Sequence, residues 1–409
     1  MKVELLGEGE DLLARALEVS HSRGSFRTPA YAVNAFDIDR KLLNEEDLPG
    51  VIEILKVFRP EQLENLSSDI SLQEKYEYYM INYMRRIPLN QLVIAIPLLE
   101  GGQGYTFSYD EISKYSDFIT ELMVNHRVDL ICTPAFSRIP EDHIPIFIEK
   151  FLEAMASYSK NVALTIPYAS RETRVKVAET YLKWAGKNNI ALLNFLCIDY
   201  NGSNPITKYS YHNYVLRYVQ LLEREVGEPI VMYGVNVKYS RVSKKYDELP
   251  ARDLASYFAQ VDIYGSNHKR RPIPGEVAEK LGAEESAKKQ KLLNRNRYTY
   301  VSLDKIHKDP SLKPPDINAE IIEQLLKAPR NTSRFERLVK LINIKTTIEE
   351  AKILRKLFSS GEYGPFKTPL QYLKSKEVVR IDDILLQRLN MFNRIYKPRT
   401  KSLYEYSSK

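Results

Sequence analysis

Five acidic residues lie at or near the ends of apolar runs that have the composition of buried strands. They are Asp37, Asp39, Glu100, Asp199 and Asp262. A carboxylate in such a place can attack an electrophilic carbon or move a proton. We expect Glu100 and Asp262 to be catalytic. A solvated turn is the alternative role for Glu100, and a buried pair with a lysine or arginine is the alternative for Asp262.

Positive charge is concentrated after residue 267. The chain has a formal net charge of +7, and residues 268–297 hold nine lysines and arginines against four glutamates. This surplus favours a polyanionic partner, and we expect that partner to be nucleic acid. The alternative is that these charges form a solvated helix face without a ligand. The side chains expected to contact it are His268, Lys269, Arg270, Arg271, Arg295 and Arg297.

The elements that must position these residues are a series of strands and helices in alternation. Continuous apolar runs are typical of strands covered on both faces, as in parallel sheets. Segments with apolar residues three and four apart separate these runs and predict helices. The eight predicted strands are 28–33, 51–55, 92–96, 128–132, 162–166, 191–196, 230–233 and 261–264. Eight such units favour an α/β fold of the (β/α)8 TIM-like barrel type, whose chemistry is carried at the carboxyl ends of the strands.

Composition divides the chain into three predicted parts. They are a barrel over 1–274, a basic connection over 275–315 and a small, mainly helical C-terminal domain over 316–409. No apolar run approaches the roughly 20 residues that a membrane span needs, and the N-terminus has no signal segment, so we expect a cytoplasmic protein without a membrane partner. Cys132 and Cys197 both lie in apolar runs and are expected to be buried small hydrophobic residues. We expect neither a metal nor a cofactor.

Several short motifs, in an order that is preserved along the chain, resemble those of the tRNA-guanine transglycosylase superfamily. The resemblance covers residues 20–274. The segments that carry it are Thr28-Pro29-Ala30, Leu98-Leu99-Glu100-Gly101-Gly102-Gln103, Ile166-Pro167-Tyr168, Pro229-Ile230-Val231-Met232-Tyr233-Gly234-Val235 and Asp253-Leu254 through Val261-Asp262-Ile263-Tyr264-Gly265. The resemblance implies that the base is bound by Gly101, Gly102, Tyr168, Asn194 and Tyr264.

The chain departs from the family pattern at the residues that carry its chemistry. Gly265 stands where the family has its aspartate nucleophile, Leu99 stands where a second aspartate acts near the base, and the zinc-binding cysteines are missing. The pattern is therefore more similar to a divergent branch, found in phages and mobile elements, that places 7-deazaguanine bases in DNA. The activity that the resemblance implies is exchange of guanine for a 7-deazaguanine derivative in nucleic acid, with DNA favoured over tRNA.

Two other functions remain open at this point. The first is a catalytically inactive nucleic-acid-binding partner subunit of a transglycosylase, in a hetero-oligomer or a homodimer, in which the nucleophile has decayed to Gly265. The second is an unrelated barrel hydrolase or lyase that acts on a small phosphorylated metabolite. Weak affinity for nucleic acid at physiological salt would favour the second.

Overall fold

The computed structural model describes residues 1–38, 48–102, 107–124, 127–158, 160–239, 248–269, 290–315, 325 and 333–407. Eight parallel strands close into a barrel, because each strand pairs with the next and the last pairs with the first. In chain order they are β4 (Ala30–Asn34), β5 (Val51–Phe58), β6 (Leu92–Glu100), β7 (Leu130–Cys132), β9 (Asn161–Ile166), β10 (Phe195–Ser203), β11 (Val231–Val237) and β13 (Ile263–Gly265). The predicted (β/α)8 TIM-like barrel is confirmed.

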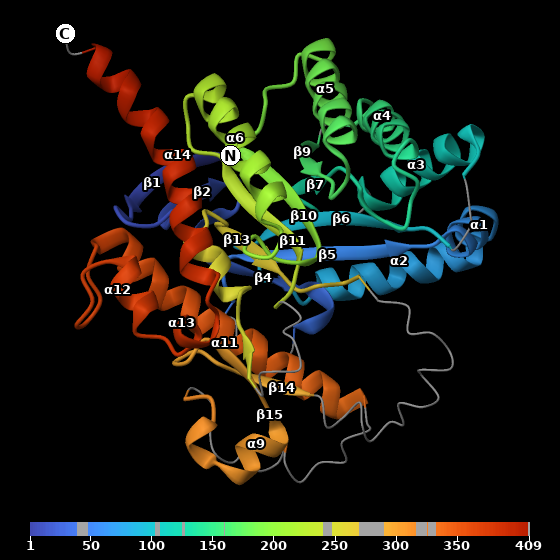
Figure 1. The fold of residues 1–409 in the computed structure, drawn as a ribbon. Helices are drawn as coiled ribbons and strands as arrows, with labels where there is room; N and C mark the ends of the chain where they lie inside the picture. The colour runs from blue at the N-terminus through green and yellow to red at the C-terminus, as the bar shows by residue number, and fades with distance from the viewer. Residues whose placement is uncertain are drawn as a thin grey trace.

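Helices follow most of the strands, as the alternating pattern predicts (Figure 1). They are η1 (Ala35–Asp37), α1 (Pro60–Ser68), α2 (Ile70–Met84), α3 (Tyr109–Val124), α4 (His143–Met155), α5 (Arg171–Lys187), α6 (Tyr209–Val226) and η3 (Leu254–Phe258). The helices next to β4 and β13 are single short 3-10 turns, so the barrel's own helices leave this side thinly covered. A short strand, β8 (Ala135–Ser137), extends the sheet beside the end of β6.

A small antiparallel sheet precedes the barrel and covers its amino end. Its strands are β1 (Lys2–Glu8), β2 (Arg15–His21) and β3 (Gly24–Arg27). Val3, Leu17, Val19 and Phe26 of this region belong to the same buried cluster as the inward-facing residues of the barrel strands. The side of the barrel that remains open is therefore the carboxyl end.

The region after the barrel contains a hairpin and a group of helices. The hairpin strands β14 (Lys291–Asn294) and β15 (Thr299–Ser302) pair with each other, and β15 also pairs with β12 (Leu249–Pro250). The helices are α9 (Leu303–Lys308), η4 (Pro310–Leu312), α11 (Ser333–Ser360), α12 (Pro369–Lys374), α13 (Val378–Ile381) and α14 (Leu385–Ser407). The basic segment 275–315 was expected to be a connection, but from residue 290 onward it forms regular structure.

The long helix α11 covers the side of the barrel that the short 3-10 turns leave thin. It packs against β4, β1, β2 and β14, on the side away from α3, α4 and α5 (Figure 1). α14 packs against α6. Among the described residues, no helix has the length and apolar character needed to cross a bilayer.

Candidate active site at the carboxyl end of the barrel

A buried glutamate lies inside the barrel, under the residues that follow its last strand. Glu53 is on β5 between Val51 and Leu55, whose side chains belong to the cluster that fills the barrel, and its own side chain is 1% exposed. His268 Nε2 donates to Glu53 Oε1 at 2.6 Å, and the Tyr233 hydroxyl donates to Oε2. Burial and the Glu53 carboxylate raise the pKa of Tyr233, which keeps this hydroxyl protonated as a donor. Both carboxylate oxygens are thus hydrogen-bonded, as a buried carboxylate requires.

The glutamate has room only because the residue opposite is glycine. A Cβ atom at Gly265, the last residue of β13, would lie 2.1 Å from Glu53 Oε2. No side chain can be added there without moving the carboxylate. The Glu53 carboxylate therefore fills the space into which a side chain at position 265 would project.

A second buried ion pair adjoins the first. Lys269 Nζ lies 2.6 Å from Asp199 Oδ2 and donates to Asn201 Oδ1 at 3.0 Å. The other oxygen of Asp199 accepts from Asn236 Nδ2 at 3.0 Å. The His268 backbone amide donates to Asn236 Oδ1 at 3.1 Å, which joins the two pairs into one network that links β5, β10 and β11 to the segment after β13.

The backbone at the end of β10 is shaped to place Asp199. Asn201 and Gly202 have positive φ values of 53° and 70°, and the register with β11 shifts between Asp199 and Ser203. Asparagine and glycine are the residues that adopt this conformation most readily. Residues 199–203 are therefore a bulged continuation of the strand.

Glu100, one of the two expected catalytic residues, lies at the carboxyl end as expected, where two arginines hold it. Its Oε2 accepts from Arg59 Nε at 2.7 Å, and its Oε1 lies 2.9 Å from Arg138 Nη2. Burial by itself would raise the pKa of Glu100, but the hydrogen bonds and charges of the two arginines hold it below its usual value. The carboxylate is 2% exposed and the arginines are 44% and 41% exposed, so guanidinium groups face the solvent here.

Asp262, the other expected catalytic residue, lies at the opposite end of the barrel. It immediately precedes β13, and its carbonyl accepts from the amide of Ala30, the first residue of β4. Arg15 of β2 binds both of its carboxylate oxygens, at 2.9 and 2.8 Å, and the Met232 amide donates to Oδ2 at 2.8 Å. Burial raises the pKa of Asp262 and Arg15 opposes this rise. The buried ion pair is therefore the arrangement found, and the structure does not bring Asp262 and Glu100 together.

The residues expected to bind the base are also dispersed. Gly101 and Gly102 follow β6, and Tyr168 lies beyond β9, 39% exposed, with Lys208 Nζ 3.9 Å from its ring centroid. Asn194 precedes β10 at the amino end and donates to Glu228 at 2.7 Å. Tyr264 packs outside the barrel wall, edge-on to Tyr31.

Of the residues expected to contact nucleic acid, those described all have partners within the chain. His268 and Lys269 belong to the buried network and are not exposed loop residues. Arg297 Nη2 lies 3.1 Å from Glu248 Oε1, and Arg295 Nη1 lies 3.7 Å from Glu350 Oε2. Arg270 and Arg271 lie outside the described residues.

Sequence reasoning missed Glu53, Tyr233, Arg59 and Arg138 as members of the site. The signal for Glu53 was present, because it is a charged residue in the middle of a continuous apolar strand. Its partner His268 is 215 residues away, which no local pattern reveals. Arg59 follows β5 and Arg138 follows β8. They are far from Glu100 in the sequence, and the closed barrel brings them next to it.

The network has the groups that acid–base and nucleophilic chemistry need: carboxylates, a histidine within hydrogen-bond distance of one of them, and a lysine. Among the described residues, no three His, Cys, Asp or Glu side chains are grouped so as to hold a metal ion. No family model matches this chain, and no curated protein is significantly similar to it.

Proposed function

We propose that this chain is a base-exchange transglycosylase that replaces guanine in nucleic acid by a 7-deazaguanine derivative, with Glu53 as its nucleophile. The observation that carries the proposal is the place of the Glu53 carboxylate against Gly265. The motif resemblance puts the nucleophile of related enzymes at this glycine. A carboxylate from β5 fills the space that the missing side chain leaves. The preference for DNA over tRNA rests on the resemblance alone.

The proposed reaction has two displacement steps. In the first, a Glu53 oxygen bonds to the anomeric carbon of the sugar, the carbon–nitrogen bond to guanine breaks, and the departing base takes the electron pair together with a proton. In the second, the nitrogen of the incoming base attacks the same carbon, loses its proton, and releases the carboxylate. His268 contacts Glu53 and is the group proposed to deliver the first proton and accept the second.

The neighbouring ion pairs suit supporting roles. Lys269 pairs with Asp199, and Asp199 also accepts from Asn236. Asn236 in turn accepts from the His268 backbone amide, so these contacts hold His268 in place. Arg59 and Arg138 are about two-fifths exposed at the end of β6, where they could contact phosphates of the substrate. Asp262 is given no part in the reaction because it lies at the far end of the barrel, beside Arg15 of β2.

The test is release of radiolabelled guanine from duplex DNA and, separately, from tRNA, with 7-deazaguanine as the incoming base. We expect wild-type protein to exchange and Glu53→Gln to lose exchange by a factor on the order of 10³ or more. The sharper variant is the double substitution Glu53→Gly with Gly265→Asp, which moves the carboxylate to β13 in the same space. It should recover part of the activity, while Gly265→Asp alone should clash with Glu53 and recover none.

Two results would overturn the proposal. Exchange that survives Glu53→Gln in a folded protein would remove Glu53 from the reaction. Absence of exchange by wild type on both substrates, with salt-sensitive binding of nucleic acid retained, would instead favour the inactive partner subunit. Circular dichroism of every variant establishes that it is folded.

A further inference from the structure

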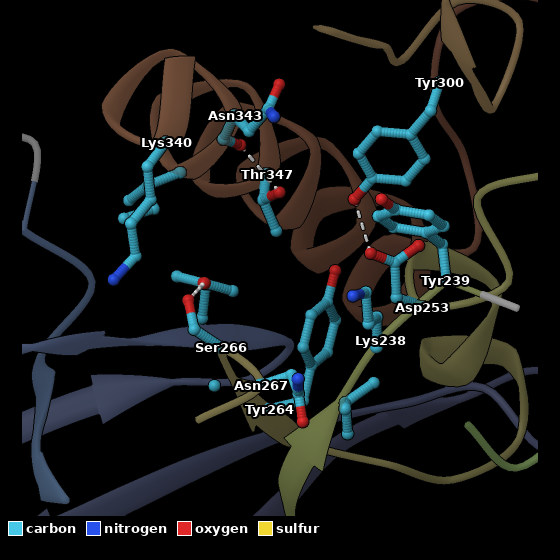
Figure 2. Close-up of a pocket in the computed structure, with 14 residues that line it drawn as sticks. Lys238, Tyr239, Asp253, Tyr264, Ser266, Asn267, Tyr300, Lys340, Asn343 and Thr347 are labelled. Carbon is cyan, nitrogen blue, oxygen red and sulfur yellow. Dashed lines mark hydrogen bonds between the residues drawn. The ribbon is translucent and has the colours of Figure 1, made fainter. Parts of the chain in front are cut away.

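The cavity beside β13 shows how the chain pairs its own charges. This space of about 210 Å³ is bounded by the residues after β11 and β13, by β15 and by α11 (Figure 2). Tyr300 donates to Asp253, and Lys340 Nζ lies 2.6 Å from Asp37 Oδ2. Lys238 Nζ lies 5.5 Å from the centroid of a neighbouring tyrosine ring. Each charged side chain that lines this cavity thus has a partner within the chain, so these charges do not call for a ligand.

The outward face of α2 is different, because its large apolar side chains are exposed. Tyr76, Met80 and Met84 of this helix are buried and belong to the cluster that surrounds the barrel. On its other faces and just beyond its end lie six of the fifteen exposed large apolar side chains of the described residues. They are Ile70, Leu72, Tyr78, Tyr79, Ile81 and Leu89. Single exposed apolar residues are common, but a concentration of them marks an interaction surface.

Residues 70, 74, 78, 81 and 85 form one stripe along this face, because positions three and four apart are neighbours on a helix surface. Ile70, Tyr78 and Ile81 are 72%, 64% and 46% exposed. Glu74 and Arg85 are exposed as well, and neither side chain has a partner among the described residues. The stripe therefore offers apolar surface, one free carboxylate and one free guanidinium group.

The stripe is complementary to itself. Its residues lie at equal distances on either side of a point between positions 79 and 80, and each pair matches in chemistry. The pairs are Tyr78 with Ile81, Glu74 with Arg85, and Ile70 with Leu89, which follows the helix end. A two-fold axis through this point would place a second α2 antiparallel to the first. Every contact would then be made twice, as a two-fold interface requires.

We propose that α2 is the interface of a homodimer in which two copies of this chain pack antiparallel through the stripe. Tyr78 meets Ile81 of the second copy in water-excluded contact, and Glu74 gains Arg85 of the second copy as its ion-pair partner. The acid and the base leave the stripe without net charge, so a polyanion such as nucleic acid would gain little by binding there. One helix pair is a small interface, so the dimer should dissociate in the micromolar range.

This pairing also sets how the two barrels face. A helix of the barrel runs opposite to the strand that precedes it, so antiparallel α2 helices place the strands of the two barrels in opposite directions. The two carboxyl ends, each with its Glu53 network, then open on opposite sides of the dimer. Each candidate site is complete within one copy, and the inference does not rest on the proposed function.

The test is sedimentation velocity of the full-length chain. We expect a monomer–dimer equilibrium at loading concentrations between about 1 μM and about 300 μM. Glu74→Arg and Arg85→Glu should each weaken association about tenfold or more, because each turns two attractive contacts into two repulsive ones. The double variant exchanges the charges and restores both contacts, so it should associate nearly as strongly as wild type. Glu121→Arg, the same change at an exposed position of α3, is the matched control.

Three results would overturn the proposal. A wild-type chain that stays monomeric across this concentration range has no such interface. A double variant that associates no better than the single variants would assign the dimer to another surface. Tyr78→Ala should also weaken association, and if it instead weakened only the binding of a single-stranded oligonucleotide, the stripe would belong to nucleic acid.

The dimer and the proposed function can fail separately. Glu74→Arg should lose the dimer and keep the exchange of guanine per chain, because each site is complete within one copy. Glu53→Gln should lose exchange and keep the dimer.

Discussion

Glu53, Glu100 and Asp262 are buried carboxylates with similar partners, but they lie at different positions in the barrel. Glu53, Glu100 and Asp262 are each almost fully buried, and each contacts at least one nitrogen donor from an arginine or a histidine. A buried carboxylate needs such partners whether or not it reacts. The end of the barrel at which each one lies is therefore the better guide to its role.

The pair of Asp262 with Arg15 should matter for stability and not for chemistry. Removing one partner from a buried ion pair leaves the other charge uncompensated, which costs about 3–5 kcal/mol. We therefore expect Asp262→Asn to lower the free energy of unfolding by about this amount, measured by urea denaturation followed through the fluorescence of Trp184. Exchange activity per folded molecule should be unchanged. A variant as stable as wild type but without activity would show that Asp262 takes part in the reaction.

At the scale of elements, the barrel strands could be predicted from the sequence, but the hairpin of β14 and β15 could not. All eight apolar runs are barrel strands, because a strand buried on both faces leaves a continuous apolar signature. The run 191–196 is displaced, since β10 begins at Phe195 and continues to Ser203 with polar residues that the run did not include. The hairpin of β14 and β15 was missed because its charged surroundings suggested a connection.

The candidate site was predicted less well, for a reason that the same elements explain. Sequence patterns identify which residues end a strand, but the side-chain partners come from distant segments. Asp262 pairs with Arg15 across 247 positions, and Glu53 pairs with His268 across 215. The direction of a side chain, inward or outward, follows strand register, and Glu53 could have been found by asking why an apolar strand contains one charge.

His212 connects three elements and should make stability depend on pH. Its Nε2 donates to the Ala259 carbonyl at 2.8 Å, and the Tyr200 hydroxyl lies 2.7 Å from its Nδ1, so α6 is tied to β10 and to the segment before β13. Burial lowers the pKa of His212 to about 3, and the hydrogen bond to Ala259 opposes this only partly. The folded state therefore keeps a neutral imidazole that the unfolded chain protonates below about pH 6.5.

The sign follows from proton binding. Between about pH 3 and pH 6.5 the unfolded state binds more protons, so the stability due to His212 is complete above this window and is lost as the pH falls through it. At pH 5 the loss should be about 2 kcal/mol. We expect His212→Gln to be less stable than wild type at pH 7, and this difference to shrink by that amount at pH 5. Urea denaturation at the two pH values measures it, and an unchanged difference would contradict the neutral buried imidazole.

At the scale of the whole molecule, the barrel and the C-terminal helices share one core. Leu354 and Leu357 of α11 are fully buried and belong to the same cluster as residues from the barrel's outer face. This helix covers the side where the barrel's own helices are short. The predicted boundary at residue 316 therefore marks a change of sequence pattern. It marks an independently folding unit only if the C-terminal helices unfold separately from the barrel.

We expect a single unfolding transition, because neither part can bury its apolar surface without the other. The chain provides a local probe in Trp184, its one tryptophan, which lies on α5 away from α11. Leu354→Ala should lower the stability reported by Trp184 fluorescence by about 2–5 kcal/mol, the usual effect of such a cavity. Far-UV circular dichroism should give the same shift, and Lys356→Ala, at an exposed position of the same helix, should shift neither signal. The opposite result would be an unfolding transition of Trp184 that Leu354→Ala does not shift, together with a separate loss of helical signal at lower urea. It would show that the C-terminal helices are a domain of their own.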